Sequence, residues 1–294
     1  MRLKAWSLAA LLALLPSCIF HNPFPHTTRV DPPLPAVALS PAELLEKLDE
    51  TSEAVETLRA SGDFHVSGGA LKTFESTEAQ ASGILVVERP DKIHVQVKLL
   101  GVTVADMVSL GSEYRMRLPS KKQFFTGDAA NRATTSEKWY ENMRPGHIQD
   151  ALFVNTLPYR TDPHVKYTIE QDKQGRRSFY VIDFLEETTS GALEKRQRIW
   201  FDRYDKEVTR KKIFRSDGVI EADVEYMEYQ TFCGVAFPRT IVMRRPLDDY
   251  ELTITLAPDK IRLNEQMNDD MFGLSPQPGD KVILRDAREN SVTP

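Results

Sequence analysis

The residue types that most often carry chemistry are few in this chain, and they are scattered. Its 294 residues include six histidines and two cysteines, and no two histidines lie at metal-ligand spacing within one predicted helix or strand. The sequence has no nucleophile elbow, phosphate-binding glycine loop or paired-cysteine motif. The acidic pairs Asp248-Asp249 and Asp269-Asp270 fall at predicted turns, where solvated carboxylates are expected. We therefore predict a noncatalytic protein with no cofactor and no metal site; a hydrolase built on scattered carboxylates is the alternative.

One cysteine lies in a context that predicts a covalent modification. Arg2 and Lys4 precede an uncharged, mostly apolar run at residues 5–15, which is too short to span a bilayer but has the length of a secretion signal. The sequence Leu-Pro-Ser-Cys follows at residues 15–18 and resembles the bacterial lipobox. We predict that residues 1–17 are removed and that Cys18 then carries lipid. An ordinary secretion signal beside a free cysteine is the alternative.

The segment after Cys18 is predicted to tether a folded domain to the membrane. Residues 18–39 contain repeated prolines and no regular apolar period, which argues against a helix or a central strand. Ile19 occupies the position where an aspartate would signal retention in the inner membrane of a Gram-negative cell. We therefore expect the protein at the outer membrane of a bacterial cell envelope, facing the periplasm.

The charge and the second cysteine restrict the classes of partner. The chain has 38 basic and 43 acidic side chains, and loss of Arg2 and Lys4 with the signal leaves 36 against 43, a net charge near −7. Such a chain lacks the basic footprint that nucleic acids require. Cys233 would have no intrachain partner once Cys18 carries lipid, so we predict that it is a small buried apolar residue.

The first folded element is predicted to be a helix. Ser40 and Glu43 have the spacing of a capping box, with a proline at the first helical position between them. Leucine and valine residues then recur on one stripe, with charged residues opposite. This pattern predicts a helix that begins at residue 41, runs to about Ala60 and stops at Gly62.

Short strands are predicted after this helix. Ile93, Val95 and Val97 alternate with polar residues, which indicates a half-buried strand with His94 on its solvent side. Comparable patterns occur at residues 63–71, 83–89, 102–110, 113–119, 165–171, 178–185, 194–201, 207–215, 218–229, 235–244, 250–263 and 281–284. The short connections between them predict an antiparallel sheet. A short helix is predicted at residues 146–153.

This set of elements predicts an α+β fold that is mostly β. One apolar face of an antiparallel sheet must be covered, and so little helix can cover only part of a large sheet. The strands therefore either close into a barrel or sandwich, or curl into an open half-barrel. We predict one domain at residues 40–286, followed by a flexible tail at residues 287–294.

The order of the segments resembles the superfamily of lipoprotein carriers that includes LolA and LolB. The resemblance is carried by the hydrophobic run and Arg-Pro-Asp-Lys turn at residues 81–93, by Ile-Trp-Phe-Asp at 199–202, by the turn at 213–218, and by the Tyr-x-x-Tyr and Gly-x-x-x-Pro pattern within 224–239. It implies a curved antiparallel sheet that forms an open half-barrel, covered by the N-terminal helix and short helices, whose concave apolar face holds acyl chains. It also implies a protruding hydrophobic loop for lipid delivery. The sequence does not show which segment would form this loop.

The candidate ligand-binding residues are apolar residues predicted to face inward from the strands. They are Ile84, Val86, Ile93, Val95, Val97, Met107, Met116 and Ile254. We expect them to bind lipid or the acyl chains of a lipoprotein through burial of apolar area, in a membrane-anchored carrier or receptor. The alternative is a structural or assembly lipoprotein with a packed core, which docks on an envelope protein partner.

Overall fold

A computed structural model of the protein describes residues 36–68, 81–129 and 142–285. These residues belong to one compact unit, Ala36–Pro294. The predicted signal segment, Cys18, residues 18–35 of the predicted tether and the tail at residues 287–294 lie outside the described residues.

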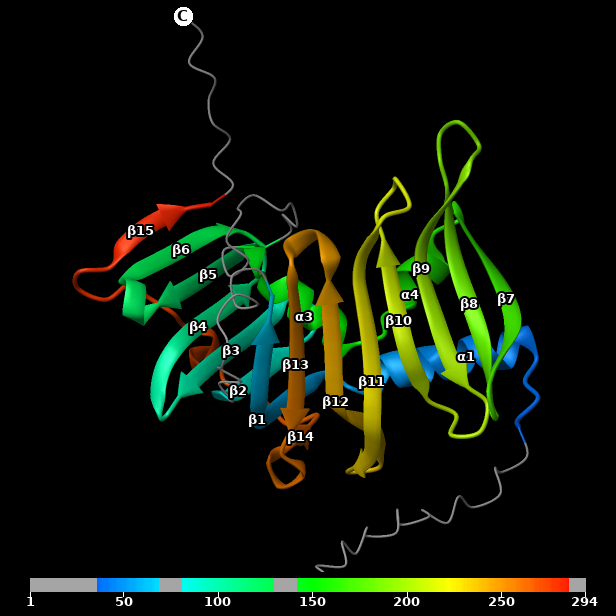
Figure 1. The fold of residues 1–294 in the computed structure, drawn as a ribbon, viewed down its shortest axis with the longest axis horizontal. Coiled ribbons are helices and arrows are strands. Elements are labelled where there is room, and N and C mark those ends of the chain that lie inside the picture. The colour runs from blue at the N-terminus through cyan, green and yellow to red at the C-terminus, as the bar shows by residue number, and fades with distance from the viewer. Residues whose placement is uncertain (1–35, 69–80, 130–141, 286–294) are drawn as a thin grey trace, which may run out of the picture. The chain divides into compact units, whose positions relative to one another are not determined.

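The described strands form one large sheet that curves without closing (Figure 1). Its first half contains β1 (Thr57–Ser67), β2 (Ala81–Glu88), β3 (Lys92–Leu99), β4 (Val102–Leu110), β5 (Glu113–Leu118), β6 (Gln123–Asp128) and the late strands β14 (Arg262–Leu263) and β15 (Lys281–Leu284). Its second half contains β7 (Val165–Gln174), β8 (Arg177–Glu187), β9 (Leu193–Asp202), β10 (Val208–Phe214), β11 (Ile220–Phe232), β12 (Val235–Arg245) and β13 (Tyr250–Leu256).

The strand order shows how the two halves join. It runs β15-β6-β5-β4-β3-β2-β1-β13-β12-β11-β10-β9-β8-β7, with β14 beside β1. The neighbouring strands pair in antiparallel fashion, except that β15 pairs in parallel with β6. The join is the pairing of β1 with β13, where Phe64 lies opposite Ile254. The two edges, β15 and β7, do not meet, so the predicted open half-barrel is confirmed.

Three described α-helices lie on one side of this sheet (Figure 1). They are α1 (Pro41–Glu53), α3 (Pro145–Leu152) and α4 (Leu157–Thr161). Single turns of 3-10 helix occur at η2 (Pro119–Lys121), η3 (Pro246–Asp248), η4 (Pro258–Lys260) and η5 (Asp269–Phe272). The face beneath the α-helices is the concave face, and its buried apolar side chains form the main core together with Leu44, Leu45 and Leu48 of α1.

The start of α1 was predicted correctly, and its end was not. The Ser40 side chain accepts a hydrogen bond from the Glu43 amide, while the Glu43 carboxylate accepts one from the Ser40 amide at 2.8 Å. The helix ends at Glu53 rather than near Ala60. From Thr57 onward the chain is β1, because its backbone pairs with both β2 and β13. Tertiary pairing therefore overrides the helical spacing of the leucines.

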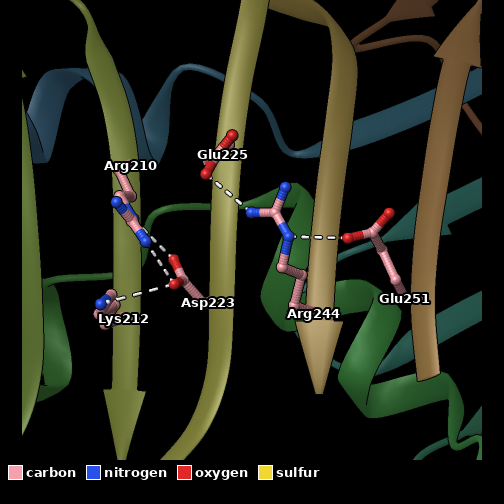
Figure 2. Close-up of polar contacts among 6 residues, drawn as sticks. All are labelled: Arg210, Lys212, Asp223, Glu225, Arg244 and Glu251. Atoms are coloured by element: carbon pink, nitrogen blue, oxygen red, sulfur yellow. Dashed lines mark hydrogen bonds and ion pairs between the residues drawn. The ribbon is translucent and has the colours of Figure 1, made fainter. Parts of the chain in front are cut away.

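The convex face of the second half is covered by its own charged side chains. Arg210 and Asp223 meet at 2.5 Å across β10 and β11, and Arg244 of β12 lies 2.7 Å from both Glu225 and Glu251 on the flanking strands (Figure 2). Such cross-strand pairs suit a face that contacts water. The concave face is the apolar side that needs a cover.

The convex face of the first half is covered by the C-terminal segment. Phe272 of η5 packs on Val86 and Val108, forming a second, smaller apolar cluster. Beside it, Met271 accepts a hydrogen bond at its carbonyl oxygen from His94. His94 therefore lies on the predicted polar face, but it is partly buried rather than solvated.

Two sequence predictions about exposure were wrong. Cys233 is exposed and forms a tight turn with Gly234 between β11 and β12, with φ of 50° and 86°; such two-residue turns protrude from a sheet. Asp248, predicted to be solvated, is 2% exposed. Its carboxylate lies 2.5 Å from the guanidinium of Arg245, an ion pair that compensates the burial.

Candidate functional site

The predicted ligand-binding residues divide between the two faces of the sheet. Six of them belong to the main core under the helices or pack against it: Ile93, Val95, Val97, Met107, Met116 and Ile254. The structure thus brings together residues from β3, β4, β5 and β13. Ile84 and Val86 lie on the convex face, where Ile84 is 39% exposed and Val86 is covered by Phe272.

The error on β2 has a simple origin. Residues 84–87 are all apolar, so alternation cannot tell which pair points inward. The register with β3 places Leu85 opposite Val95 and Val87 opposite Ile93. Leu85 and Val87 are therefore the concave residues of this strand, and both are fully buried.

The concave face is packed with side chains. A cavity of about 20 Å³ lies where the ends of α1 and α3 meet the second half of the sheet. Its lining includes Val55, Phe153, Tyr226 and Phe237. This volume holds about one water molecule, whereas small-molecule sites are typically about 300–1,000 Å³. An acyl chain would enter this face only if a covering helix moved.

Arg89 holds the end of α1. Its guanidinium donates hydrogen bonds to the carbonyl oxygens of Ser52 and Val55, the latter at 3.4 Å. It also lies over the ring of Phe153 at 5.4 Å from the centroid. Burial lowers the pKa of Arg89, and the charges of Glu53 and Glu56 oppose this effect. One cation from the β2–β3 turn thus contacts the ends of both α1 and α3.

Lys211 holds the end of α3 from the floor of the concave face. It lies on β10, is 2% exposed, and donates hydrogen bonds from Nζ to the carbonyl oxygens of Asp150 and Phe153. A helix C-terminus carries partial negative charge and unsatisfied carbonyls, so a buried ammonium is stabilised there. The sequence offered no signal for this role, since a lysine in a strand is usually solvated.

Asp49 fastens α1 to the segment that contains α4. Its carboxylate accepts a hydrogen bond from the Thr156 hydroxyl at 2.8 Å and forms an ion pair with Arg160. Arg160 also donates to the carbonyl of Leu45 at 3.4 Å. Polar contacts therefore join the covering helices to each other and to the sheet.

A second feature is the tip of the β3–β4 hairpin. Leu100 is 97% exposed and Val102 is 67% exposed. Leu100 and Gly101 have φ of 49° and 82°, the backbone of a turn that favours asparagine or glycine. A leucine at such a position is both conformationally strained and exposed to water, and the structure contains no apolar partner for it among the described residues.

Side chains of the types that bind metals are dispersed over the described part of the chain. No three histidine, cysteine, aspartate or glutamate side chains there form a group that could hold a metal ion. Within the same residues, no helix has both the length and the apolar character needed to span a bilayer.

The geometry above defines a class: an open antiparallel half-barrel with a helix-covered apolar concave face. Solved structures share this fold. The chain superposes on a DUF1329 family protein from Desulfovibrio piger with a TM-score of 0.54 and 10% sequence identity, covering 78% of this chain and 94% of that one. A domain from Vibrio parahaemolyticus, named as an outer membrane lipoprotein-sorting protein domain, gives 0.50 and 13%, with the same coverage.

A LolA superfamily protein from Nitrosomonas europaea is also similar, with a TM-score of 0.49 and 11% identity, over 81% of this chain and 99% of that one. No protein-family model and no curated protein matches the chain. The chain therefore shares its half-barrel fold with the Desulfovibrio piger protein and the Vibrio parahaemolyticus domain, and this is the fold that the sequence resemblance implied.

Proposed function

We propose that this protein is a noncatalytic carrier or receptor of the bacterial envelope, which holds the acyl chains of a lipid or lipoprotein between its concave sheet face and the covering helices. The observation that carries the proposal is the fastening of α1 and α3 by Arg89 and Lys211 over an apolar face. These polar contacts at the ends of α1 and α3 help to hold the cover in place. Loss of those contacts would expose a continuous apolar surface of the kind that binds acyl chains.

The membrane attachment belongs to the same proposal. Lipid on Cys18 would anchor the chain, and residues 18–39 would tether the domain. Within the last residues of this segment, Val37 bonds with Arg203 and Leu39 bonds with Tyr180, both at 2.9 Å. Labelling cells with a palmitate analogue tests the anchor. We expect label in the wild type and none in Cys18→Ala, and unlabelled wild type would refute it.

The apolar hairpin tip supports delivery to a membrane. Leu100 and Val102 project from the sheet with no apolar cover among the described residues, and Lys98 lies close by on β3. This tip is our candidate for the protruding hydrophobic loop that the sequence resemblance implies. Its insertion into a bilayer would bring the half-barrel within reach of a membrane.

Binding is tested with residues 36–294, purified without detergent. Native mass spectrometry would show co-purified lipid, and titration with a fluorescent fatty acid would give the affinity. The matched control is Met227→Glu, which places a charge on the exposed convex side of β11 and should leave binding unchanged. Absence of both extractable lipid and fatty-acid binding in a folded sample would refute the carrier proposal.

The packed interior favours one alternative, a structural or assembly lipoprotein. The cavity of about 20 Å³ is that of a filled core, and such a domain would act through its exposed faces. Chemical crosslinking in cells would then trap one stoichiometric envelope partner, and the purified domain would bind no fatty acid.

A further inference from the structure

Tyr226 carries a buried hydroxyl group without a hydrogen-bond partner among the described residues. The side chain lies on the concave side of β11 and is 4% exposed. Two other tyrosines of this face have partners: the Tyr229 hydroxyl donates to the carbonyl of Val208 at 2.8 Å, and the Tyr250 hydroxyl lies 3.1 Å from Nδ1 of His147. Tyr226 is therefore an exception that needs a reason.

The position of Tyr226 connects it to the covering helices. Tyr226 lines the small cavity between α1, α3 and the sheet, together with Phe153. Ser52 and Gln197 also have a buried oxygen without a partner in the described structure, but neither lines this cavity. Of these three side chains, Tyr226 alone lines the small cavity between the covering helices and the sheet.

Lys211 brings a positive charge to the same face of the sheet, on the strand next to that of Tyr226. It pairs with Val224 in the β10–β11 register, and Tyr226 is the next residue of β11 on that face. The Lys211 ammonium bonds to the carbonyl of Phe153, whose ring lines the cavity beside Tyr226. If the end of α3 moves away, the Lys211 ammonium loses these oxygen acceptors, and ligand oxygens in their place would offset the cost of removing acceptors from a buried charge.

We propose that Tyr226 and Lys211 form a polar binding point for an anionic oxygen group at the end of an acyl chain, inside an otherwise apolar interior. The hydroxyl and the ammonium would both donate to this group, which replaces the α3 carbonyls when the cover opens. The ligand class is an acyl lipid with a carboxylate or a phosphate, in preference to a neutral ester. This inference rests on the proposed carrier function and specifies its cargo.

The fold by itself does not require a tyrosine at position 226. A phenylalanine would fill the same space and would leave no buried hydroxyl unpaired, so Tyr226→Phe should keep or raise the melting temperature of the ligand-free protein. A residue that gains nothing for the fold but recognises a ligand is expected at functional sites.

The test uses residues 36–294 loaded with a fluorescent fatty acid, displaced by oleate, by methyl oleate or by phosphatidylglycerol. We expect the wild type to prefer oleate over methyl oleate by about tenfold, and Tyr226→Phe to reduce this ratio severalfold. Lys211→Met should nearly abolish it. The ratio is the readout because Lys211→Met also changes the cover and hence the affinity for both competitors. Tyr250→Phe, which removes a buried hydroxyl elsewhere on the same face, should keep the wild-type ratio.

The outcomes are separable. A wild type that binds the probe but shows equal affinity for oleate and methyl oleate overturns the inference and leaves the carrier function standing, as does an unchanged ratio in Tyr226→Phe. A folded wild type that does not bind the probe overturns the carrier function and the inference with it. Stronger displacement by oleate or by phosphatidylglycerol identifies a carboxylate or a phosphate as the recognised group.

Discussion

The Lys211 ammonium donates a hydrogen bond of 2.7 Å to the carbonyl oxygen of Phe153, the C-cap residue of α3. This contact joins the middle of the sheet to the end of a covering helix. Arg89, in the β2–β3 turn of the first half of the sheet, lies over the ring of the same phenylalanine. The end of α3 is therefore fixed to both halves of the half-barrel.

Replacing Lys211 by methionine should loosen α3. The substitution keeps the length of the side chain but leaves the carbonyls of Asp150 and Phe153 without this donor, which costs about 1–3 kcal/mol for buried groups. We expect Lys211→Met to accelerate amide hydrogen exchange in residues 145–153, compared with the wild type, by more than in the strands below. Lys212→Met is the control, since Lys212 pairs with Asp223 on the convex face at 3.5 Å. Equal effects of the two substitutions would contradict the role of Lys211.

Replacing Arg89 by leucine should make acyl ligands bind more tightly. The contacts of Arg89 with Ser52, Val55 and Phe153 exist only while the cover is closed, so they oppose any ligand that opens it. Loss of about 1.4 kcal/mol from the closed state would raise the affinity about tenfold. Fluorescent fatty-acid titration measures the change. Arg59→Leu, at an exposed position on β1, is the control. Weaker binding by Arg89→Leu would contradict the claim that the Arg89 contacts stabilise the closed cover.

His94 has a geometry that favours its protonated form. Nε2 lies 2.7 Å from the Asp106 carboxylate and Nδ1 lies 2.6 Å from the Met271 carbonyl. Both partners accept hydrogen bonds, so both ring nitrogens must carry a proton for the two bonds to form. Burial lowers the pKa of His94, but the contacts with Asp106 and Met271 raise it by more.

The C-terminal segment should therefore detach more readily at alkaline pH. Because the folded-state pKa of His94 is raised, its stabilising contribution is complete below about pH 6.5, the value of a free histidine, and is lost as the pH rises through the folded-state pKa. Hydrogen exchange at residues 269–274, corrected for its intrinsic pH dependence, should increase over this range. His94→Gln should remove the dependence.

A local measurement is necessary in this pH experiment. Burial and the nearby Asp205 and Asp202 raise the pKa of Glu207 to about 7, so global stability also decreases as the pH rises from about 4.5 to 7. Glu207 lies at the β9–β10 turn, in the other half of the sheet. A pH-independent exchange rate at residues 269–274 would exclude the role of His94 whatever the global stability does.

The hairpin tip should bind membranes through Leu100. Insertion of one leucine side chain contributes about 1.5–3 kcal/mol, so Leu100→Asp should lower co-sedimentation with phosphatidylglycerol-containing vesicles by tenfold or more. Thermal stability should not fall, because Leu100 is 97% exposed. Leu193→Asp, at another exposed leucine, is the control. Unchanged sedimentation of Leu100→Asp would remove the tip from the proposed function.

Local sequence patterns were informative where local physics decides the structure. The capping box at Ser40 and Glu43 and the terminal strand Lys281–Leu284 were located correctly, since caps and short apolar segments depend on adjacent residues. β6 was not predicted, because residues 123–128 have no clear alternation. The Arg-Pro-Asp-Lys turn is recognisable as a motif in the sequence, but the motif does not predict the contacts of Arg89 with α1 and α3.

By itself, the sequence determined that this chain is mostly β with one capped N-terminal helix, and it predicted a lipid-bearing Cys18 that the described residues do not reach. The tertiary structure decided which side of β2 faces the core, where α1 ends, and which cations hold the cover. These features depend on pairing between distant segments, such as β1 with β13 and Lys211 with Phe153. A pattern read along the chain contains no information about that pairing, because the partner that selects each conformation lies tens to hundreds of residues away.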